Sequence, residues 1–213
     1  MKQFDYTEKW KKLLTPEIVS YLTTIHEYKG KQYLIAERHA DVLENLVEMA
    51  KIQSTESSNK IEGIYTSEER LKKIVLDKTM PRTRNEREIA GYRDVLNTIH
   101  ENFQHIPIRD TFILQLHRDL YKFENASNGG RFKTSDNIIE EEDEKGNKFV
   151  RFRPLPAWET PDAIINLCTA YNEAINQGEA DSLLLISMFI IDFLCIHPFN
   201  DGKVTLRYQQ NVA

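Results

Sequence analysis

Apolar residues recur at steps of three and four through most of this chain, and this spacing constrains the fold more than any other feature. It places apolar side chains along one stripe of an α-helix, whereas the strict alternation of a half-buried strand is almost absent. In the first of the expected helices the stripe includes Leu46, Val47 and Met49, which we expect to be buried. The spacing predicts an all-α fold with helices over residues 33–52, 66–76, 85–103, 110–123, 161–178 and 181–196. The last of these is apolar nearly all round, so we expect it to be central.

One stretch, Asn128 to Pro154, departs from the helical spacing. Ile138-Ile139 and the run Phe149-Val150-Arg151-Phe152 flank an acidic segment, Glu140 to Asn147, that contains Gly146-Asn147. Two short apolar runs around such a segment predict a β-hairpin with the acidic residues in its turn. Because a lone two-stranded ribbon is marginally stable, we expect it to lean on the helical body.

The composition narrows the classes of partner. With 40% hydrophobic residues and a net charge of −5, the chain has the make-up of a folded soluble domain without a basic field, so we expect no nucleic-acid partner. Its first residues contain no apolar signal, and the longest apolar stretch, 183–196, falls short of the ~20 residues of a membrane span, so we expect no membrane partner. Cys168 and Cys195 lie in apolar helical patterns, which predicts buried thiols and a cytoplasmic protein.

The sharpest local signal is His197-Pro198-Phe199-Asn200-Asp201-Gly202, directly after the last expected helix. Pro198 disfavours helical geometry at the residue before it, so the helix should end at His197 and present the imidazole at the mouth of the core. Asp201 can hold a hard cation, and a helix starting after Gly202 would direct free N–H groups at phosphate oxygens. With a histidine to accept a proton from a hydroxyl, the pattern predicts transfer of a phosphate-containing group. The structural alternative is a plain helix stop followed by an Asp-Gly turn.

Those six residues resemble the start of the core motif of the Fic family, His-Pro-Phe-x-Asp/Glu-Gly-Asn-Gly-Arg-x-x-Arg. Upstream, Ser58-Asn59-Lys60-Ile61-Glu62-Gly63 resembles the family's inhibitory motif, Ser/Thr-x-x-x-Glu-Gly/Asn. The stretches 129–134 and 152–156 resemble the two sides of its flap hairpin. The resemblance covers about residues 33–202 and implies a Fic-type helical bundle with a small β-hairpin flap.

The resemblance also implies an activity, which is transfer of AMP from ATP to a Ser, Thr or Tyr hydroxyl of a target protein docked at the flap, about residues 131–152. His197 would be the catalytic base. Asp201 would bind Mg²⁺, and the residues that would contact ATP are Asn200, Gly202, Lys203 and Val204. Glu62, with Ser58 one helical turn before it, would be regulatory, because the family's inhibitory glutamate intrudes on the γ-phosphate site of ATP.

After Gly202 the chain departs from the family pattern. Where Asn-Gly-Arg-x-x-Arg is expected, the residues are Lys203, Val204, Thr205, Leu206, Arg207 and Tyr208. Arg207 lies one position before the place of the second arginine of the motif, and one position turns a side chain by ~100° on a helix. Neither arginine of the motif is therefore present in register. Since these guanidinium groups would pair with phosphate or with the glutamate, their loss predicts impaired activity. The chain ends eleven residues after Gly202, and we interpret this as an altered or truncated C-terminus.

The expected organisation is an N-terminal helical region, 1–82, that carries the inhibitory motif at 58–63, and a Fic core, 83–213, incomplete at its C-terminus. Two other functions stay open. One is a non-catalytic helical interaction module that uses the flap, and the other is related phosphate-group chemistry such as removal of AMP. A homodimer also stays open.

Overall fold

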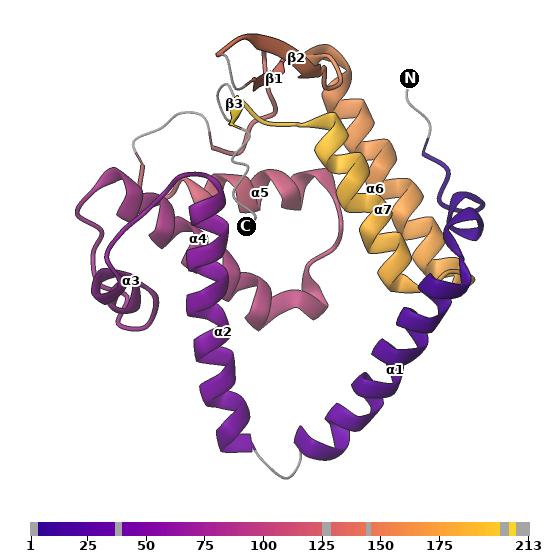
Figure 1. Ribbon diagram of the computed structural model, residues 1–213, viewed down its shortest axis with the longest axis horizontal. Coiled ribbons are helices and arrows are strands. Elements are labelled where there is room, and N and C mark those ends of the chain that lie inside the picture. Colours follow the sequence, from indigo (N-terminus) through magenta and orange to yellow (C-terminus); the bar gives the residue numbers. More distant parts are fainter. Residues whose placement is uncertain (1–3, 37–39, 125–128, 144–145, 201–204, 208–213) are drawn as a thin grey trace. The chain divides into compact units, whose positions relative to one another are not determined.

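A computed structural model describes residues 4–36, 40–124, 129–143, 146–200 and 205–207 (Figure 1). These residues form seven α-helices, three short 3₁₀ helices and three strands. By their internal contacts they divide into two compact units. Unit 1 takes residues 1–13, 108–110 and 131–213, and unit 2 takes residues 14–107 and 111–130. The expected domain boundary at residues 82/83 stays a prediction.

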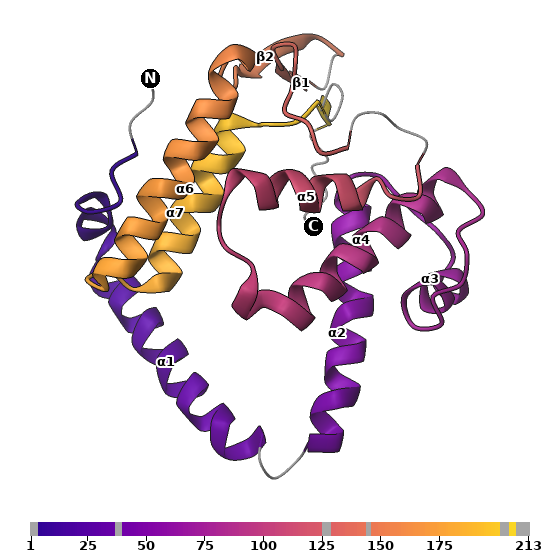
Figure 2. The ribbon, with the colours of Figure 1, turned by 180° about the vertical axis from the view of Figure 1, so that it is seen from behind.

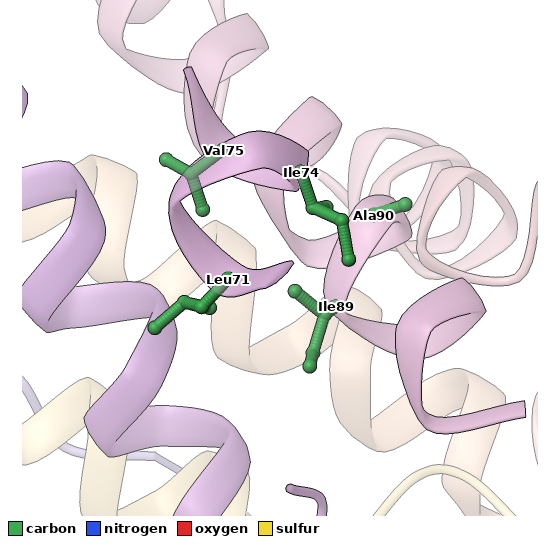
Figure 3. Packing of buried hydrophobic residues seen from close by; sticks show 5 residues of the cluster. All are labelled: Leu71, Ile74, Val75, Ile89 and Ala90. Atoms are coloured by element: carbon green, nitrogen blue, oxygen red, sulfur yellow. The ribbon is translucent and has the colours of Figure 1, made fainter. Parts of the chain in front are cut away.

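Unit 2 holds five helices: α1 (Pro16–Ala36), α2 (Ala40–Ile61), α3 (Glu68–Val75), α4 (Arg84–Asn102) and most of α5 (Asp110–Leu120). Its core lies between α3 and α4, where Leu71 and Ile74 meet Ile89 and Ala90 (Figure 3). Ile52 of α2 packs against the same cluster. The α4 helix also approaches α5 closely, since a Cβ on Gly91 would lie 1.9 Å from the Leu120 carbonyl oxygen.

Unit 1 is built on α6 (Thr160–Gln177) and α7 (Ser182–Ile196), which lie side by side in both views (Figures 1 and 2). Ile164, Leu167, Leu185 and Ile196 are fully buried. The N-terminal segment joins this unit, because the buried Tyr6 hydroxyl donates to Asp192 Oδ2 over 3.1 Å.

Local capping chemistry explains where the helices begin and end. The Ser67 hydroxyl accepts from the Arg70 N–H at the start of α3, and the Thr83 hydroxyl does the same for Glu86 at the start of α4. Asp181 caps α7, and Gly178 ends α6 in the left-handed conformation, with φ +69°. The predicted helices over 66–76, 85–103, 161–178 and 181–196 are thereby confirmed to within a few residues.

A small sheet completes unit 1. The strands β1 (Ile139–Glu142) and β2 (Lys148–Phe152) form the predicted antiparallel hairpin, with Glu141 opposite Phe149. Its turn is closed by Asp143, whose carboxylate accepts from the Asn147 N–H over 2.8 Å, and by Gly146 with φ +82°. The hairpin and the helices confirm the predicted fold class, all-α with a small β-hairpin.

The prediction was wrong about part of the hairpin. Glu140, Glu141 and Glu142 belong to β1 and not to the turn, because cross-strand pairing with residues 148–150 outweighs their low strand propensity. A third strand, β3 (Thr205–Arg207), pairs in parallel with β1 where a helix after Gly202 was expected. The sheet order is β2-β1-β3. Val204 and Thr205 are β-branched, a side-chain type that favours strands.

Four other expectations about helices and burial need correction. The single helix expected over 33–52 falls on the end of α1 and the first half of α2, and α1 begins well before it, at Pro16. Leu46, Val47 and Met49 are exposed, and so is one side of α7, with Ile190 and Leu194 more than half exposed. Cys168 is buried as expected, and burial raises the pKa of its thiol to about 11, whereas Cys195 is only half-buried.

Among the described helices none combines the length and apolar character that crossing a bilayer demands.

Candidate functional site

The loop after α7 begins with an unusual backbone conformation at His197. The helix ends at Ile196, and His197 adopts φ +48° and ψ 69°, in the left-handed region that residues other than glycine rarely enter. The His197 N–H still bonds the Phe193 carbonyl oxygen over 3.0 Å, so the residue closes the last turn as the Pro198 argument predicts. The residue as a whole is half-buried.

Phe199 anchors the loop inside unit 1. Its side chain is buried, its ring stacks on Phe132 with centroids 6.2 Å apart, and it meets the edge of Phe193 at 6.3 Å. Pro198 beside it is buried as well. The two hydrophobic residues therefore fix the loop, while Asn200 is exposed and its amide nitrogen lies 3.4 Å from the Thr134 hydroxyl.

A segment just before the hairpin donates hydrogen bonds to the carbonyl groups of this loop. Lys133 donates its backbone N–H to the Pro198 oxygen over 2.8 Å and its ammonium to the Ile196 oxygen over 2.9 Å. Asn137 donates its amide to the Phe199 oxygen over 2.8 Å. Burial lowers the pKa of the Lys133 ammonium, against the opposing effect of the Asp136 carboxylate.

Sequence reasoning missed Lys133 and Asn137 as parts of this site. Lys133 stood in a stretch matched to the flap, but nothing in its neighbours indicated that its side chain is buried, only 3% exposed. Its position three residues after the turn glycine Gly130 did not indicate burial. Gly130 has φ +76°, and its N–H donates to His117 Nδ1 of α5, also in unit 2, over 3.0 Å.

Four of the predicted ligand-binding residues, Asp201, Gly202, Lys203 and Val204, lie outside the described residues. Their assignment to Mg²⁺ and to ATP stays a prediction. In the ranges that the structure does describe, no three His, Cys, Asp or Glu side chains are grouped so as to hold a metal ion.

The inhibitory-motif segment forms the end of α2. The Gly63 N–H donates to the Lys60 oxygen, the Ile64 N–H donates to the Asn59 oxygen, and Gly63 has φ +74°. This pair of bonds with a left-handed glycine is the Schellman motif, which places Glu62 at the C-cap of the helix. Ile64 then packs against the unit 2 core.

Ser58 and Glu62 have different surroundings although they lie one turn apart. The Ser58 hydroxyl is 2.9 Å from the Tyr92 hydroxyl of α4, and Asn59 next to it is buried, with its amide bonded to the Thr55 oxygen over 2.7 Å. Glu62 is exposed and forms no ion pair with any residue of the described part. Its negative charge stands at the negative end of the α2 dipole, an unfavourable place that a purely structural cap would avoid. Glu62 belongs to unit 2 and His197 to unit 1, and their expected meeting at one cavity stays a prediction.

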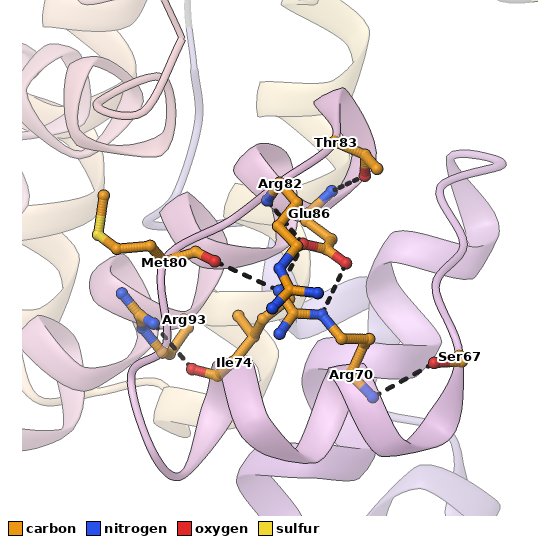
Figure 4. Close-up of polar contacts among 8 residues, drawn as sticks. All are labelled: Ser67, Arg70, Ile74, Met80, Arg82, Thr83, Glu86 and Arg93. Atoms are coloured by element: carbon orange, nitrogen blue, oxygen red, sulfur yellow. Dashed lines mark hydrogen bonds and ion pairs between the residues drawn. The ribbon is translucent and has the colours of Figure 1, made fainter.

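A pocket of about 680 Å³ in unit 2 involves none of the predicted site residues. It lies at the turn from α3 to α4, and its charged groups include Arg70, which forms an ion pair with Glu86 over 2.7 Å (Figure 4). Lys73 in its wall is paired with Glu69. Its lining residues are Glu69, Arg70, Lys73, Asp77, Thr79, Met80, Pro81 and Arg82.

Comparisons with known proteins point to one family. Residues 107–207 match the model of the Fic/DOC family, a stretch that includes Lys133, the hairpin and the His197 loop. The Ser58–Glu62 segment precedes the matched residues. No curated protein matches the chain.

Two solved structures have a similar fold. A Fic domain containing signaling protein from Bacteroides thetaiotaomicron is 20% identical, with a TM-score of 0.65, over 76% of this chain and 61% of that one. A Fic family protein from Desulfovibrio desulfuricans is also 20% identical, with a TM-score of 0.68, over 89% of this chain and 54% of that one. This chain thus spans little more than half the length of these two proteins, and at such identity the likeness concerns the fold.

Proposed function

We propose, because this chain belongs to the Fic/DOC family through residues 107–207, that it is a protein AMP-transferase which Glu62 inhibits. The observation that carries the proposal is the backbone of the His197 loop. A left-handed, half-buried histidine follows a buried helix end, and buried Pro198 and Phe199 fix the loop after it. A simple helix stop needs no such conformation at a residue that carries a Cβ.

AMP transfer requires a base that accepts the proton of the target hydroxyl and a loop that holds the reacting groups in position. A histidine can accept a proton at neutral pH. His197 would take the proton of a target hydroxyl as the hydroxyl oxygen attacks the α-phosphorus of ATP. The bond from that phosphorus to the bridging oxygen breaks, AMP stays on the target oxygen, and pyrophosphate leaves. A fixed loop suits this reaction, because orientation supplies much of the rate in phosphoryl-type transfer.

ATP would supply the activated phosphoryl group, and Mg²⁺ would neutralise its charge. Asp201 offers the carboxylate oxygen that Mg²⁺ prefers, and Gly202, Lys203 and Val204 follow it in the sequence. Asn200 is the described member of this set. It fits the role, because its exposed amide makes a long contact, 3.4 Å, to Thr134 and can donate to a phosphate oxygen.

The target would dock by strand pairing at the hairpin. β2 is at the edge of the sheet, and its outer side pairs with no other strand of the described chain. Phe149 and Val150 on β2 are each more than 40% exposed. An exposed edge with apolar side chains can accept an extended segment of another protein.

Labelled ATP tests the proposal. The chain is incubated with Mg²⁺ and ATP labelled at the α-phosphate, in the presence of a bacterial lysate as a source of targets, and a parallel reaction uses ATP labelled at the γ-phosphate. We expect α-label alone to appear on protein, more strongly with Glu62→Ala than with the native chain, and not at all with His197→Ala.

The matched control is Glu56→Ala. Glu56 lies on the same helix and pairs with the exposed Lys60, so its removal changes the charge of α2 without touching the motif glutamate. Equal labelling by the Glu56 and Glu62 variants would contradict inhibition by Glu62. Absence of α-label with every variant, or transfer of γ-label, would contradict AMP transfer.

The second candidate is a non-catalytic interaction module, and the observation that favours it is the absence of both motif arginines in register after Gly202. It predicts that His197→Ala leaves all binding unchanged. A phage-displayed peptide library panned on the native chain would yield strand-forming peptides whose binding is lost when Val150 is replaced by Pro. Removal of AMP from modified proteins, the third reading, would appear as release of α-label from a labelled target.

A further inference from the structure

The left-handed conformation of His197 is bracketed by hydrogen bonds from one short segment. The carbonyl groups of Ile196, Pro198 and Phe199 lie immediately around His197, and all three accept from residues 133–137. The donors are the Lys133 ammonium, the Lys133 N–H and the Asn137 amide, at 2.8 to 2.9 Å. The residue that carries the imidazole is therefore held from both sides by a segment 60 residues away in the sequence.

The Lys133 ammonium is placed unusually for a lysine. The side chain is 3% exposed, although lysine is among the residues least often buried. It donates to the carbonyl oxygen of Ile196, the last residue of α7. The last carbonyl oxygens of a helix have no intrahelical partner, and they lie at the negative end of the helix dipole. Removing either the buried ammonium or the carbonyl oxygen that accepts from it would leave the other group without a hydrogen bond, which costs free energy.

We propose that Lys133 is a positioning residue for His197, assisted by Asn137. Its ammonium ends α7 at Ile196 and its backbone N–H fixes Pro198, so that His197 between them is kept in the left-handed conformation and its ring at the protein surface. Without the ammonium the last turn of α7 loosens and His197 relaxes towards ordinary backbone angles. The catalytic consequence rests on the proposed function, whereas the structural consequence rests on these contacts alone.

Two substitutions of Lys133 distinguish the effect of its hydrogen-bond donor from the effect of its side-chain volume. Lys133→Met keeps most of the unbranched apolar side chain but cannot donate, and Lys133→Arg keeps a cationic donor. The matched control is Arg93→Met in unit 2. Arg93 is 5% exposed and donates to the Ile74 oxygen near the end of α3 over 2.7 Å, the same kind of bond far from His197 in the sequence.

The measurements are amide hydrogen exchange of residues 193–200 and the NMR titration of the His197 ring, neither of which needs enzyme activity. We expect Lys133→Met to speed exchange in this stretch at least ~10-fold and to shift the ring titration, since local opening becomes easier. Lys133→Arg should restore both to near native values. Arg93→Met should leave both unchanged even where it lowers the melting temperature.

Asn137→Ala provides a milder variant in case Lys133→Met does not fold, and it should speed exchange at 197–200 in a folded protein. Native exchange in Asn137→Ala and Lys133→Met would overturn the proposal, and so would an equal effect of Arg93→Met, which would mean general destabilisation. If the native chain transfers AMP, Lys133→Met should lower kcat more than it raises KM. If it transfers none, the proposed function fails while exchange and titration still decide the role of Lys133.

Discussion

Gly63 shows at the scale of one residue how the inhibitory-motif segment is held. Its φ of +74° lets two N–H groups, its own and that of Ile64, return to α2, and this fixes the exposed Glu62 at the helix end. Any other residue would meet strain here, although a Cβ at Gly63 would touch nothing within 4 Å. The glycine of the motif is thus explained by backbone conformation alone.

We therefore expect Gly63→Ala to destabilise the protein by about 1 kcal/mol, through backbone strain and not through a clash. Gly30→Ala is the matched control, because Gly30 lies inside α1 without a positive φ, and its Cβ would also meet nothing within 4 Å. That variant should be neutral or more stable by about 0.5–1 kcal/mol, owing to the higher helix propensity of alanine. Urea unfolding followed by circular dichroism measures both, and equal effects would contradict the account of Gly63.

At the scale of elements, one buried ion pair joins α3 to the start of α4. Arg70 donates from two nitrogens to Glu86, at 2.9 and 2.7 Å, and the Arg82 N–H donates to the same carboxylate over 2.7 Å (Figure 4). Glu86 is 4% exposed. The hydrogen bonds from Arg70 lower the pKa of the Glu86 carboxyl to about 2, against the opposing effect of burial. These helices also carry the unit 2 core (Figure 3).

This pair predicts how stability depends on pH. Because the pKa of Glu86 is lower in the folded chain than its ordinary value of 4.5, its contribution is complete above pH 4.5 and is lost as the pH falls towards 2. We expect Glu86 to account for a loss on the order of 2–3 kcal/mol over that range. Urea unfolding at stepped pH values gives the free energy of unfolding as a function of pH. The acid limb of this curve, below pH 4.5, should be flatter for Glu86→Gln than for the native chain.

Glu88→Gln serves as the control for this measurement. Glu88 lies on the same helix and pairs with Arg84, whose side chain is 77% exposed, and such a pair contributes little. Its replacement should leave the acid limb as in the native chain. An acid limb in Glu86→Gln as steep as the native one would contradict the role given to the Arg70–Glu86 pair.

The ends of elements were predictable where the deciding chemistry is local. Ser67 before two acids, Gly178 after an apolar run and Pro198 after His197 each act on neighbouring backbone groups, and the structure has a helix end at each. Burial was less predictable, because it depends on which helix covers which face. The apolar residues of α7 indicated a central helix, but Ile190 and Leu194 are exposed. Lys133 was beyond prediction, since its partner Ile196 lies 63 residues away.

At the scale of the whole molecule, the proposed function draws on both compact units. Glu62 comes from unit 2, and His197 with Asn200 from unit 1. The match to the Fic/DOC family model covers residues 107–207, and the Glu62 segment lies before it. The proposed function therefore requires that the Glu62 carboxylate competes with the γ-phosphate of ATP.

Titration calorimetry with Mg²⁺ and ATP tests that claim most directly. A carboxylate in the γ-phosphate position repels ATP, so removing it should strengthen binding even if the missing arginines abolish transfer. We predict that Glu62→Ala binds ATP at least ~10-fold more tightly than the native chain, a gain of about 1.4 kcal/mol, while Glu56→Ala binds as the native chain does. Equal affinity of the Glu62 variant and the native chain, or no binding by either, would contradict the claim.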